Sequence, residues 1–269
     1  MAKPILDDDL WTLIEPRLPP PKPRRFRYPG RKPITNRQAL TGIIFVLRTG
    51  IPWELLPREM GCGSGISCWR RLRDWQASGV WLAIHHHLLD ELRRSDEIDL
   101  SIVTADSGTV RAVGRGGKTG PNPTDRRKPG TKHHLSTDAE GVPLSSTISG
   151  ANRPDGEFLI PLIDAIPPIK GKVGAPIFRP EAVVADKAYT WTSNIVSLGI
   201  RGIEAWLPER GTDEDRHLGI FRWVVERTIA WLHQFRRLRV RYERRADIHQ
   251  AFLTLGCILI CHRYLKASF

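Results

Sequence analysis

The sequence predicts a mixed α/β fold, in which a sheet flanked by helices follows an all-α N-terminal part. Three observations support this prediction. Residues 5–94 place apolar side chains at helical spacing, interrupted by links rich in proline and glycine. Residues 101–149 change to short runs rich in β-branched residues. Residues 155–265 alternate helical patterns with short apolar strands, which is typical of a sheet packed between helices.

The N-terminal part is expected to be helical. Asn36 is a candidate N-cap, and Gly50 a candidate stop, for one of its helices. The proline-rich run 19–23 cannot be helical and predicts an extended arm. Apolar spacing predicts four helices, over residues 5–18, 36–48, 67–77 and 80–94.

The third of these helices is basic on its outer side, where it carries Arg70, Arg71 and Arg73. A helix, a turn, a basic helix and a further helix are the layout of a helix-turn-helix DNA-binding unit. A plain three-helix bundle has the same pattern, so both interpretations stay open.

From residue 101 the order is three strands, helix, strand, helix, strand, helix. This is the element order of the ribonuclease-H-like fold, and it places a domain boundary between residues 1–97 and 98–269. The stretch 113–132 is polar and glycine-rich and is expected to be a flexible loop. Strands are expected over 101–106, 133–138, 144–149, 182–186 and 203–207, and helices over 155–166, 191–198, 221–238 and 248–265.

Composition excludes several classes of protein. The chain has 269 residues, of which 41% are hydrophobic, and no run of 18 apolar residues that would span a membrane. Its first residues contain no apolar signal core, and four cysteines are too few for a disulfide scaffold. We expect a cytoplasmic protein without a membrane partner or a nucleotide cofactor.

The charge is the most informative number. Lys+Arg 41 against Asp+Glu 29 gives a net charge of +12. The excess is concentrated in three arginine-rich clusters, and arginine suits bidentate contacts with phosphate. This pattern predicts a nucleic-acid partner. The clusters span residues 16–53, which contain nine basic residues and no acid, 111–132 and 236–245.

Three acidic residues are placed where chemistry is expected. Asp106 and Asp186 each end a predicted strand, where α/β sheets place their sites. Glu226 lies within an otherwise apolar and basic helix, where a carboxylate is costly unless it is exposed or paired. Three carboxylates without dedicated Cys or His ligands favour Mg²⁺ or Mn²⁺. Two such ions would serve phosphoryl transfer.

Several short segments form a recognisable set. They are Thr104–Ser107 with Val110–Ala112, Gly117–Pro123, Gly150–Arg153, Ala185–Tyr189 and Arg222–Thr228, together with Leu10–Trp11, Thr49–Trp53 and Trp69–Leu72 in the N-terminal part. In chain order they resemble bacterial DDE transposases, and most of all the insertion sequence five family. In the family signature around the glutamate, Arg222 and Glu226 match, whereas Gly219 stands at a tyrosine position and His233 at a lysine position.

The resemblance implies a ribonuclease-H-like core, a DNA-binding N-terminal region and two divalent ions, Mg²⁺ or Mn²⁺, held by Asp106, Asp186 and Glu226. It implies cut-and-paste transposition by a bacterial, nucleoid-associated protein. Water hydrolyses the strand at the element end, and the freed 3′-hydroxyl attacks target DNA. The partners are double-stranded DNA, as element ends and target, and a second copy in a homodimer on DNA. Two alternatives are a decayed DNA-binding repressor and a nuclease of the same fold.

The basic residues near these features are expected to contact DNA. Phosphate contacts position the duplex, and base contacts recognise its sequence. One of the neighbouring His133 and His134 is also in a position to approach the metal ions, whereas the cysteine pairs lack zinc-site spacing. The expected DNA contacts are Arg24, Arg25, Arg27, Arg70, Arg71, Arg73, Lys118, Arg126, Arg127, Lys128, Lys132, Arg222, Arg236, Arg237, Arg239 and Arg241.

Overall fold

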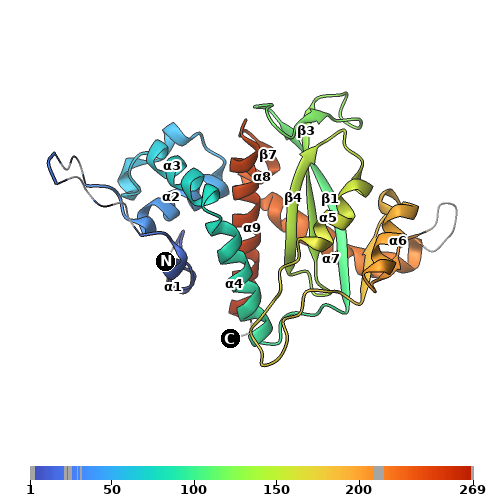
Figure 1. The fold of residues 1–269 in the computed structure, drawn as a ribbon. Helices are drawn as coiled ribbons and strands as arrows, with labels where there is room; N and C mark the ends of the chain where they lie inside the picture. The colour runs from blue at the N-terminus through green and yellow to red at the C-terminus, as the bar shows by residue number, and fades with distance from the viewer. Residues whose placement is uncertain are drawn as a thin grey trace.

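The computed structural model describes residues 4–20, 23, 26–28, 30, 32–208 and 215–267. Among these residues, no helix is both long and apolar enough to cross a membrane. Figure 1 shows a helical N-terminal part on one side and a sheet with its covering helices on the other.

The N-terminal helices form close to where the sequence predicts them. Their bounds are α1 (Asp8–Ile14), α2 (Asn36–Thr49), α3 (Gly65–Ala77) and α4 (Val80–Arg94), with short 3-10 turns η1 (Glu15–Arg17), η2 (Trp53–Leu55) and η3 (Arg58–Met60).

The start of α2 corrects one prediction. Its cap is Thr35 rather than Asn36: the Thr35 hydroxyl accepts from Gln38 N, and the Gln38 side chain accepts from Thr35 N at 2.9 Å. This reciprocal pair satisfies two backbone donors at once, which a single Asn cap does not. The helix ends at Gly50 as predicted, with a left-handed φ of 74°.

The sheet has the predicted mixed topology. β4, β3 and β1 are antiparallel neighbours, while β1, β5 and β6 run parallel, which gives the order β4-β3-β1-β5-β6. This order confirms the ribonuclease-H-like fold class. The short β2 pairs with β3, and β7 with β1. The strands are β1 (Ile102–Ala112), β2 (Gly120–Pro121), β3 (Pro129–Thr137), β4 (Pro143–Gly150), β5 (Ala182–Ala185), β6 (Glu204–Trp206) and β7 (Val240–Arg241).

Helices follow the strands in the expected order, with one break. The helix predicted over 221–238 is divided at Phe235, whose backbone is extended, into α7 (Asp215–Gln234) and α8 (Arg236–Arg239). The other segments are η4 (Asp155–Phe158), α5 (Leu159–Asp164), η5 (Lys187–Tyr189), α6 (Thr192–Ile200) and α9 (Ala246–Ala267).

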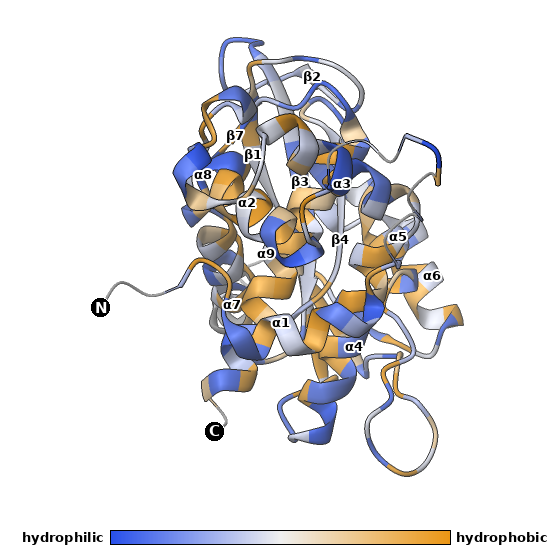
Figure 2. Cartoon of the chain, turned by 90° about the vertical axis from the view of Figure 1, so that its left-hand side faces the viewer, coloured by the Kyte–Doolittle hydropathy of each residue, from blue (hydrophilic) through white to orange (hydrophobic). Residues whose placement is uncertain are grey.

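α9 is the central helix of the molecule. Every residue from Ala251 to His262 is buried, and hydrophobic residues lie on all sides of the helix. Figure 2 shows mostly hydrophobic ribbon in the middle of the molecule, where α9 lies. Such a pattern requires neighbours on all sides. α9 packs lengthwise against α4 and contacts α3, and it also contacts β4 and α7 (Figure 1). The N-terminal helices and the sheet therefore share one hydrophobic core.

Candidate active site

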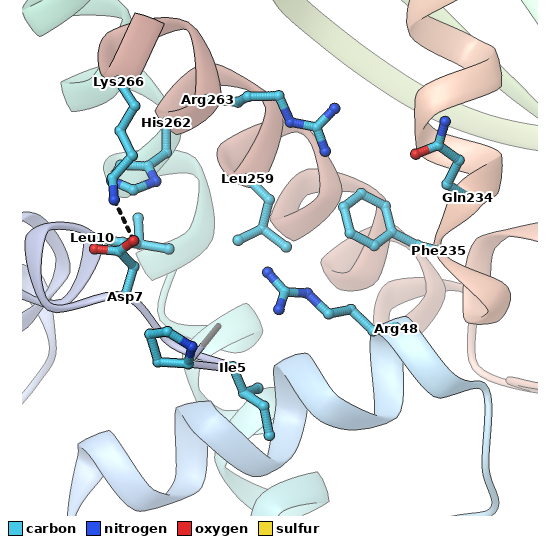
Figure 3. Close-up of a pocket in the computed structure, with 11 residues that line it drawn as sticks. Ile5, Asp7, Leu10, Arg48, Gln234, Phe235, Leu259, His262, Arg263 and Lys266 are labelled. Atoms are coloured by element: carbon cyan, nitrogen blue, oxygen red, sulfur yellow. Dashed lines mark hydrogen bonds and ion pairs between the residues drawn. The ribbon is translucent and has the colours of Figure 1, made fainter. Parts of the chain in front are cut away.

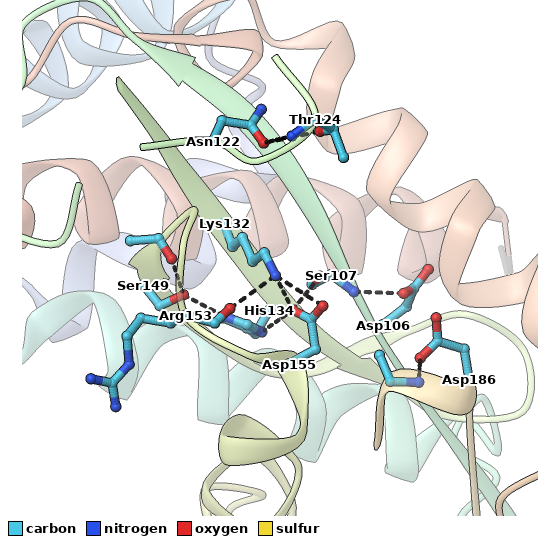
Figure 4. Close-up of polar contacts among 12 residues, drawn as sticks. Asp106, Ser107, Asn122, Thr124, Lys132, His134, Ser149, Arg153, Asp155 and Asp186 are labelled. Carbon is cyan, nitrogen blue, oxygen red and sulfur yellow. Dashed lines mark hydrogen bonds and ion pairs between the residues drawn. The ribbon is translucent and has the colours of Figure 1, made fainter. Parts of the chain in front are cut away.

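Asp106 and Asp186 lie side by side on neighbouring parallel strands. Ala105 of β1 is paired with Ala185 of β5, and each aspartate is the next residue along its own chain segment (Figure 4). Asp186 follows the end of β5, as predicted. Asp106 instead lies in the middle of β1, because β3 and β7 continue to pair with the second half of that strand.

Glu226 reaches the same strand through a close helix crossing. α7 packs against β1, and a Cβ atom at Gly108 would lie 2.9 Å from Ile229 Cγ2. Asp106 and Gly108 share one face of β1, because side chains alternate along a strand. Glu226 lies about one turn before Ile229 on α7. The three acids predicted from the sequence therefore approach one face of the sheet.

The charges of these acids act on one another. Burial is the main cause that raises the pKa of Asp106 to about 6. The Ser107 N–H, which donates to Asp106 Oδ1 at 2.7 Å, acts in the opposite direction. The neighbouring charges of Asp186 and Glu226 raise the pKa further. A cation placed among these carboxylates would relieve their repulsion.

Arg222 is the cation that Glu226 contacts in this structure, with 3.6 Å between Nη2 and Oε1. Among the described residues, no three His, Cys, Asp or Glu side chains lie close enough together in this arrangement to hold a metal ion. The donor set still fits Mg²⁺ or Mn²⁺, since all three acids offer hard carboxylate oxygens. Assembly of such a site requires Glu226 to turn from Arg222 toward Asp106.

Asp155 is a fourth carboxylate beside the pair, and the sequence analysis missed it. Its carboxylate accepts from Lys132 Nζ at 2.9 and 3.0 Å and from Ser107 Oγ at 2.7 Å (Figure 4). Ser107 directly follows Asp106, so this network holds the backbone of the catalytic candidate. The members of this network come from segments distant in sequence: the β1–β3 pairing brings Lys132 near Ser107, and Asp155 lies in the η4 turn that follows β4.

A second contact ties Asp155 to the Asp186 turn. Asn194 Nδ2 donates to Gly156 O and to Tyr189 O, both at 2.9 Å. Asn194 is 5% exposed, and its side chain bridges the η4 and η5 turns by these two hydrogen bonds. The positions of both aspartates are thereby coupled through buried polar contacts.

The two strand histidines lie apart. His133 Nε2 is 2.8 Å from His249 Nε2, deep in the core. His134 Nε2 forms a hydrogen bond of 2.7 Å with Ser149 Oγ, and His134 Nδ1 is 3.8 Å from Asp155 Oδ1. Neither imidazole contacts Asp106 or Asp186 in the contacts described for this site.

Two predicted DNA contacts are corrected by the structure. Arg237 is 5% exposed and donates to Glu243 Oε1 at 2.7 Å and to the carbonyls of Gly50 and Ile51. Arg241 is fully buried and donates to Thr131 Oγ1 at 2.7 Å, among other acceptors. Both guanidiniums are buried and hydrogen-bonded within the protein, so neither is available to a phosphate.

Lys132 is corrected in the same way, because Asp155 and the Arg153 carbonyl occupy its ammonium group. Arg24 and Arg25 lie outside the described residues. Arg222 and Arg71 are half-buried, and Arg73 donates to Asp74 Oδ1 at 2.7 Å. The remaining expected contacts are exposed: Arg27, Arg70, Lys118, Arg126, Arg127, Lys128, Arg236 and Arg239.

Comparison with protein families gives two matches that together span most of the chain. Residues 6–85 match the family model "Putative transposase of IS4/5 family". Residues 97–261 match the model "Transposase DDE domain". The second model alone covers more than half of the chain.

Two proteins of Burkholderia cepacia are similar in sequence. The "Putative transposase for insertion sequence element IS402" is 58% identical over 151 residues, which are 56% of this chain and 72% of the relative. The "Insertion element IS402 uncharacterized 16.2 kDa protein" is 64% identical over 129 residues, which are 48% of this chain and 88% of the relative.

Solved structures are more distant. The crystal structure of the Mos1 mariner paired end complex with Mn shares 13% identity over 89% of this chain and 80% of its own, with a TM-score of 0.28, which is too low to add to the assignment. The family model over residues 97–261 and the similarity to the IS402 transposase are sufficient. The chain belongs to the DDE transposases of insertion sequences.

Proposed function

We propose that this transposase cuts DNA at the ends of an insertion sequence and joins the freed ends to target DNA, using Asp106, Asp186 and Glu226. The observation that supports this most strongly is the pairing of Ala105 with Ala185, which sets the two aspartates side by side beneath α7. We further propose that residues 1–97 bind the element ends and that residues 98–269 form the catalytic domain.

The three carboxylates would hold Mg²⁺ or Mn²⁺, two ions for each site. When bound, such ions supply a more acidic attacking water and stabilise charge on the leaving oxygen. The chain itself contributes position. Ser107 N–H and the Asp155 network fix Asp106, and the Ala188 N–H donates to Asp186 Oδ1 at 2.9 Å. Arg222 is close enough to the acids to orient a phosphate once Glu226 leaves it.

The chemistry consists of two in-line displacements at phosphorus. In the first, a water oxygen forms a bond to phosphorus and the 3′-oxygen of the element strand leaves. In the second, that 3′-hydroxyl attacks a target phosphate and displaces another 3′-oxygen. Each step forms one P–O bond and breaks one. Because two ends must be joined together, we propose that a homodimer assembles on the DNA.

An assay with a labelled element end tests this function. The protein is incubated with the end fragment and a target plasmid, in Mg²⁺, in Mn²⁺ and in chelator. We expect metal-dependent nicks at the end, followed by joined products. Cutting without preference for the end, and without joining, would instead identify a nuclease. Binding without any cut under all conditions would identify a repressor and contradict the proposal.

A further inference from the structure

A cavity of about 600 Å³ opens between the N-terminal helices and the C-terminal helices, away from the aspartate pair. It is lined by residues of α1, α2, α7 and α9. Figure 3 shows Arg48, from the last turn of α2, and Arg263, from α9, directed into the same space beside Leu259 and Phe235.

The cavity has an excess of positive charge. Neither the Arg48 nor the Arg263 guanidinium makes a hydrogen bond or an ion pair with the described residues. Burial, and after it the charge of Arg263, lower the pKa of Arg48 below its ordinary value. Asp7 is the acid among the lining residues, and it is bound to Lys266 (Figure 3). Within the part of the chain that the structure describes, these two like charges thus share the cavity without a counter-ion.

One of these two arginines packs on an aromatic ring, and the other extends from a buried helix. Arg263 lies over the Trp231 ring, 5.8 Å from its centroid, which restricts the side chain. Arg48 extends from a helix whose other face is buried in the core. Both side chains are exposed to solvent, so water screens part of their repulsion, and an anion bound between them would offset what remains. Arginine pairs of this kind suit the oxygens of a phosphate.

The cavity also lies along the helix that carries Glu226. Gln234, which lines the cavity, follows Glu226 by eight residues on α7. At 1.5 Å of rise per residue, this is about 12 Å along the helix axis. A DNA strand rises 3.4 Å per nucleotide, so the distance corresponds to roughly three to four nucleotides.

We propose that Arg48 and Arg263 form a phosphate subsite for the DNA backbone, a few nucleotides from the scissile bond. The inference rests on the proposed function for the identity of the DNA, but not for the phosphate chemistry. Sequence patterns did not single out either residue as a DNA contact, because the cavity forms only when α2, α7 and α9 pack together. The subsite would tie the N-terminal helices and the catalytic helix to the same strand.

The test measures DNA affinity of the full chain against salt, in chelator so that no cleavage intervenes. The variants are Arg48→Gln, Arg263→Gln and the double variant. Arg179→Gln is the matched control: it removes the same charge from an exposed side chain before β5, at the opposite end of that strand from Asp186. Each lost phosphate contact should reduce the slope of log K against log[salt] by about 0.9.

We expect the double variant to lose about two units of slope and the control to lose none. The melting temperature should stay level or rise in the double variant, because removal of either charge relieves repulsion. An unchanged slope in a folded double variant would overturn the proposal, and so would a fall in melting temperature with full DNA binding. Pyrophosphate is titrated in parallel as a free phosphate probe; if the double variant loses its binding while the DNA slope is unchanged, the assignment to DNA is overturned.

These outcomes are independent of catalysis. If the cleavage assay fails while the double variant loses salt dependence, the subsite stands and the proposed function falls. If cleavage succeeds while the slope of the double variant is unchanged, the proposed function stands and the subsite is rejected.

Discussion

Asp106 carries a cost to stability that metal binding would remove. Burial and the neighbouring acids raise its pKa to about 6, above the ordinary value of 3.8. The folded protein therefore binds this proton more tightly than the unfolded chain. The contribution of Asp106 to stability is thus less favourable above pH 6, and the penalty disappears as the pH falls below 3.8.

The variant Asp106→Asn should accordingly be more stable than the parent at pH 7.5 in chelator. The amide oxygen can still accept from the Ser107 N–H, while the buried charge is gone. We expect a gain of about 1 kcal/mol, which corresponds to roughly 2–4 °C in Tm. Thermal melts from pH 4 to 8 measure it, and the gain should shrink toward acid pH. A stability loss at pH 7.5 would contradict this account.

Asp155 should act on catalysis through position. In Asp155→Asn the carboxylate charge that holds Lys132 is lost, while the amide oxygen still accepts from Ser107 Oγ. A shift of about 1 Å in the Asp106 backbone would cost up to roughly 100-fold in rate. We expect the single-turnover rate of end cleavage to fall about 10- to 100-fold, with DNA affinity within twofold.

The matched control for Asp155 is Asp125→Asn, which removes a carboxylate paired with exposed Lys128. Its cleavage rate should equal that of the parent. Equal rates in both variants would show that the Asp155 network does not position the site.

At the scale of elements, the corner between α7 and α8 is held by a buried ion pair. Arg237 joins Glu243 and also reaches the carbonyls at the end of α2, while its neighbour Arg236 is exposed. Loss of one partner leaves a buried charge uncompensated, which costs about 3–5 kcal/mol. We expect Arg237→Met to lose that much in urea unfolding and Arg236→Met to lose less than about 0.5 kcal/mol. Similar losses would refute a structural role for Arg237.

The same corner shows where sequence patterns stop being informative. Periodicity located most helices, and β-branched runs located the strands β1, β3, β4, β5 and β6. The sequence pattern did not predict β2 or β7. Each has only two residues and forms a strand because it pairs with a longer one, β2 with β3 and β7 with β1. The break at Phe235 was missed as well, because the apolar pattern continues through it. After the break, Arg237 donates to the carbonyls at the end of α2.

The candidate site divides in a similar way. Strand ends and an acid in an apolar helix were sufficient to single out Asp106, Asp186 and Glu226, although their role stays a prediction. Asp155 could not be found, because its partners Ser107 and Lys132 lie 48 and 23 residues away in the chain. Arg237 and Arg241 have the charge of DNA contacts, and only their burial excludes them.

At the scale of the whole molecule, α9 should make folding cooperative. It packs against α3 and α4 on one side and against β4 and α7 on the other, so neither part buries its apolar surface alone. We expect tryptophan fluorescence and far-UV circular dichroism to report one coincident urea transition. Two separate transitions would show that residues 1–97 and 98–269 fold independently.

The measurement that tests the central claim most directly is anomalous diffraction from crystals of the protein bound to an element end in Mn²⁺. The account predicts two peaks about 3.5–4 Å apart, contacting the carboxylates of Asp106, Asp186 and Glu226, with Glu226 released from Arg222. The Asp186→Asn protein, crystallised in the same way, should lose at least one peak. Manganese bound elsewhere, or unchanged peaks in the variant, would contradict the assignment of this site.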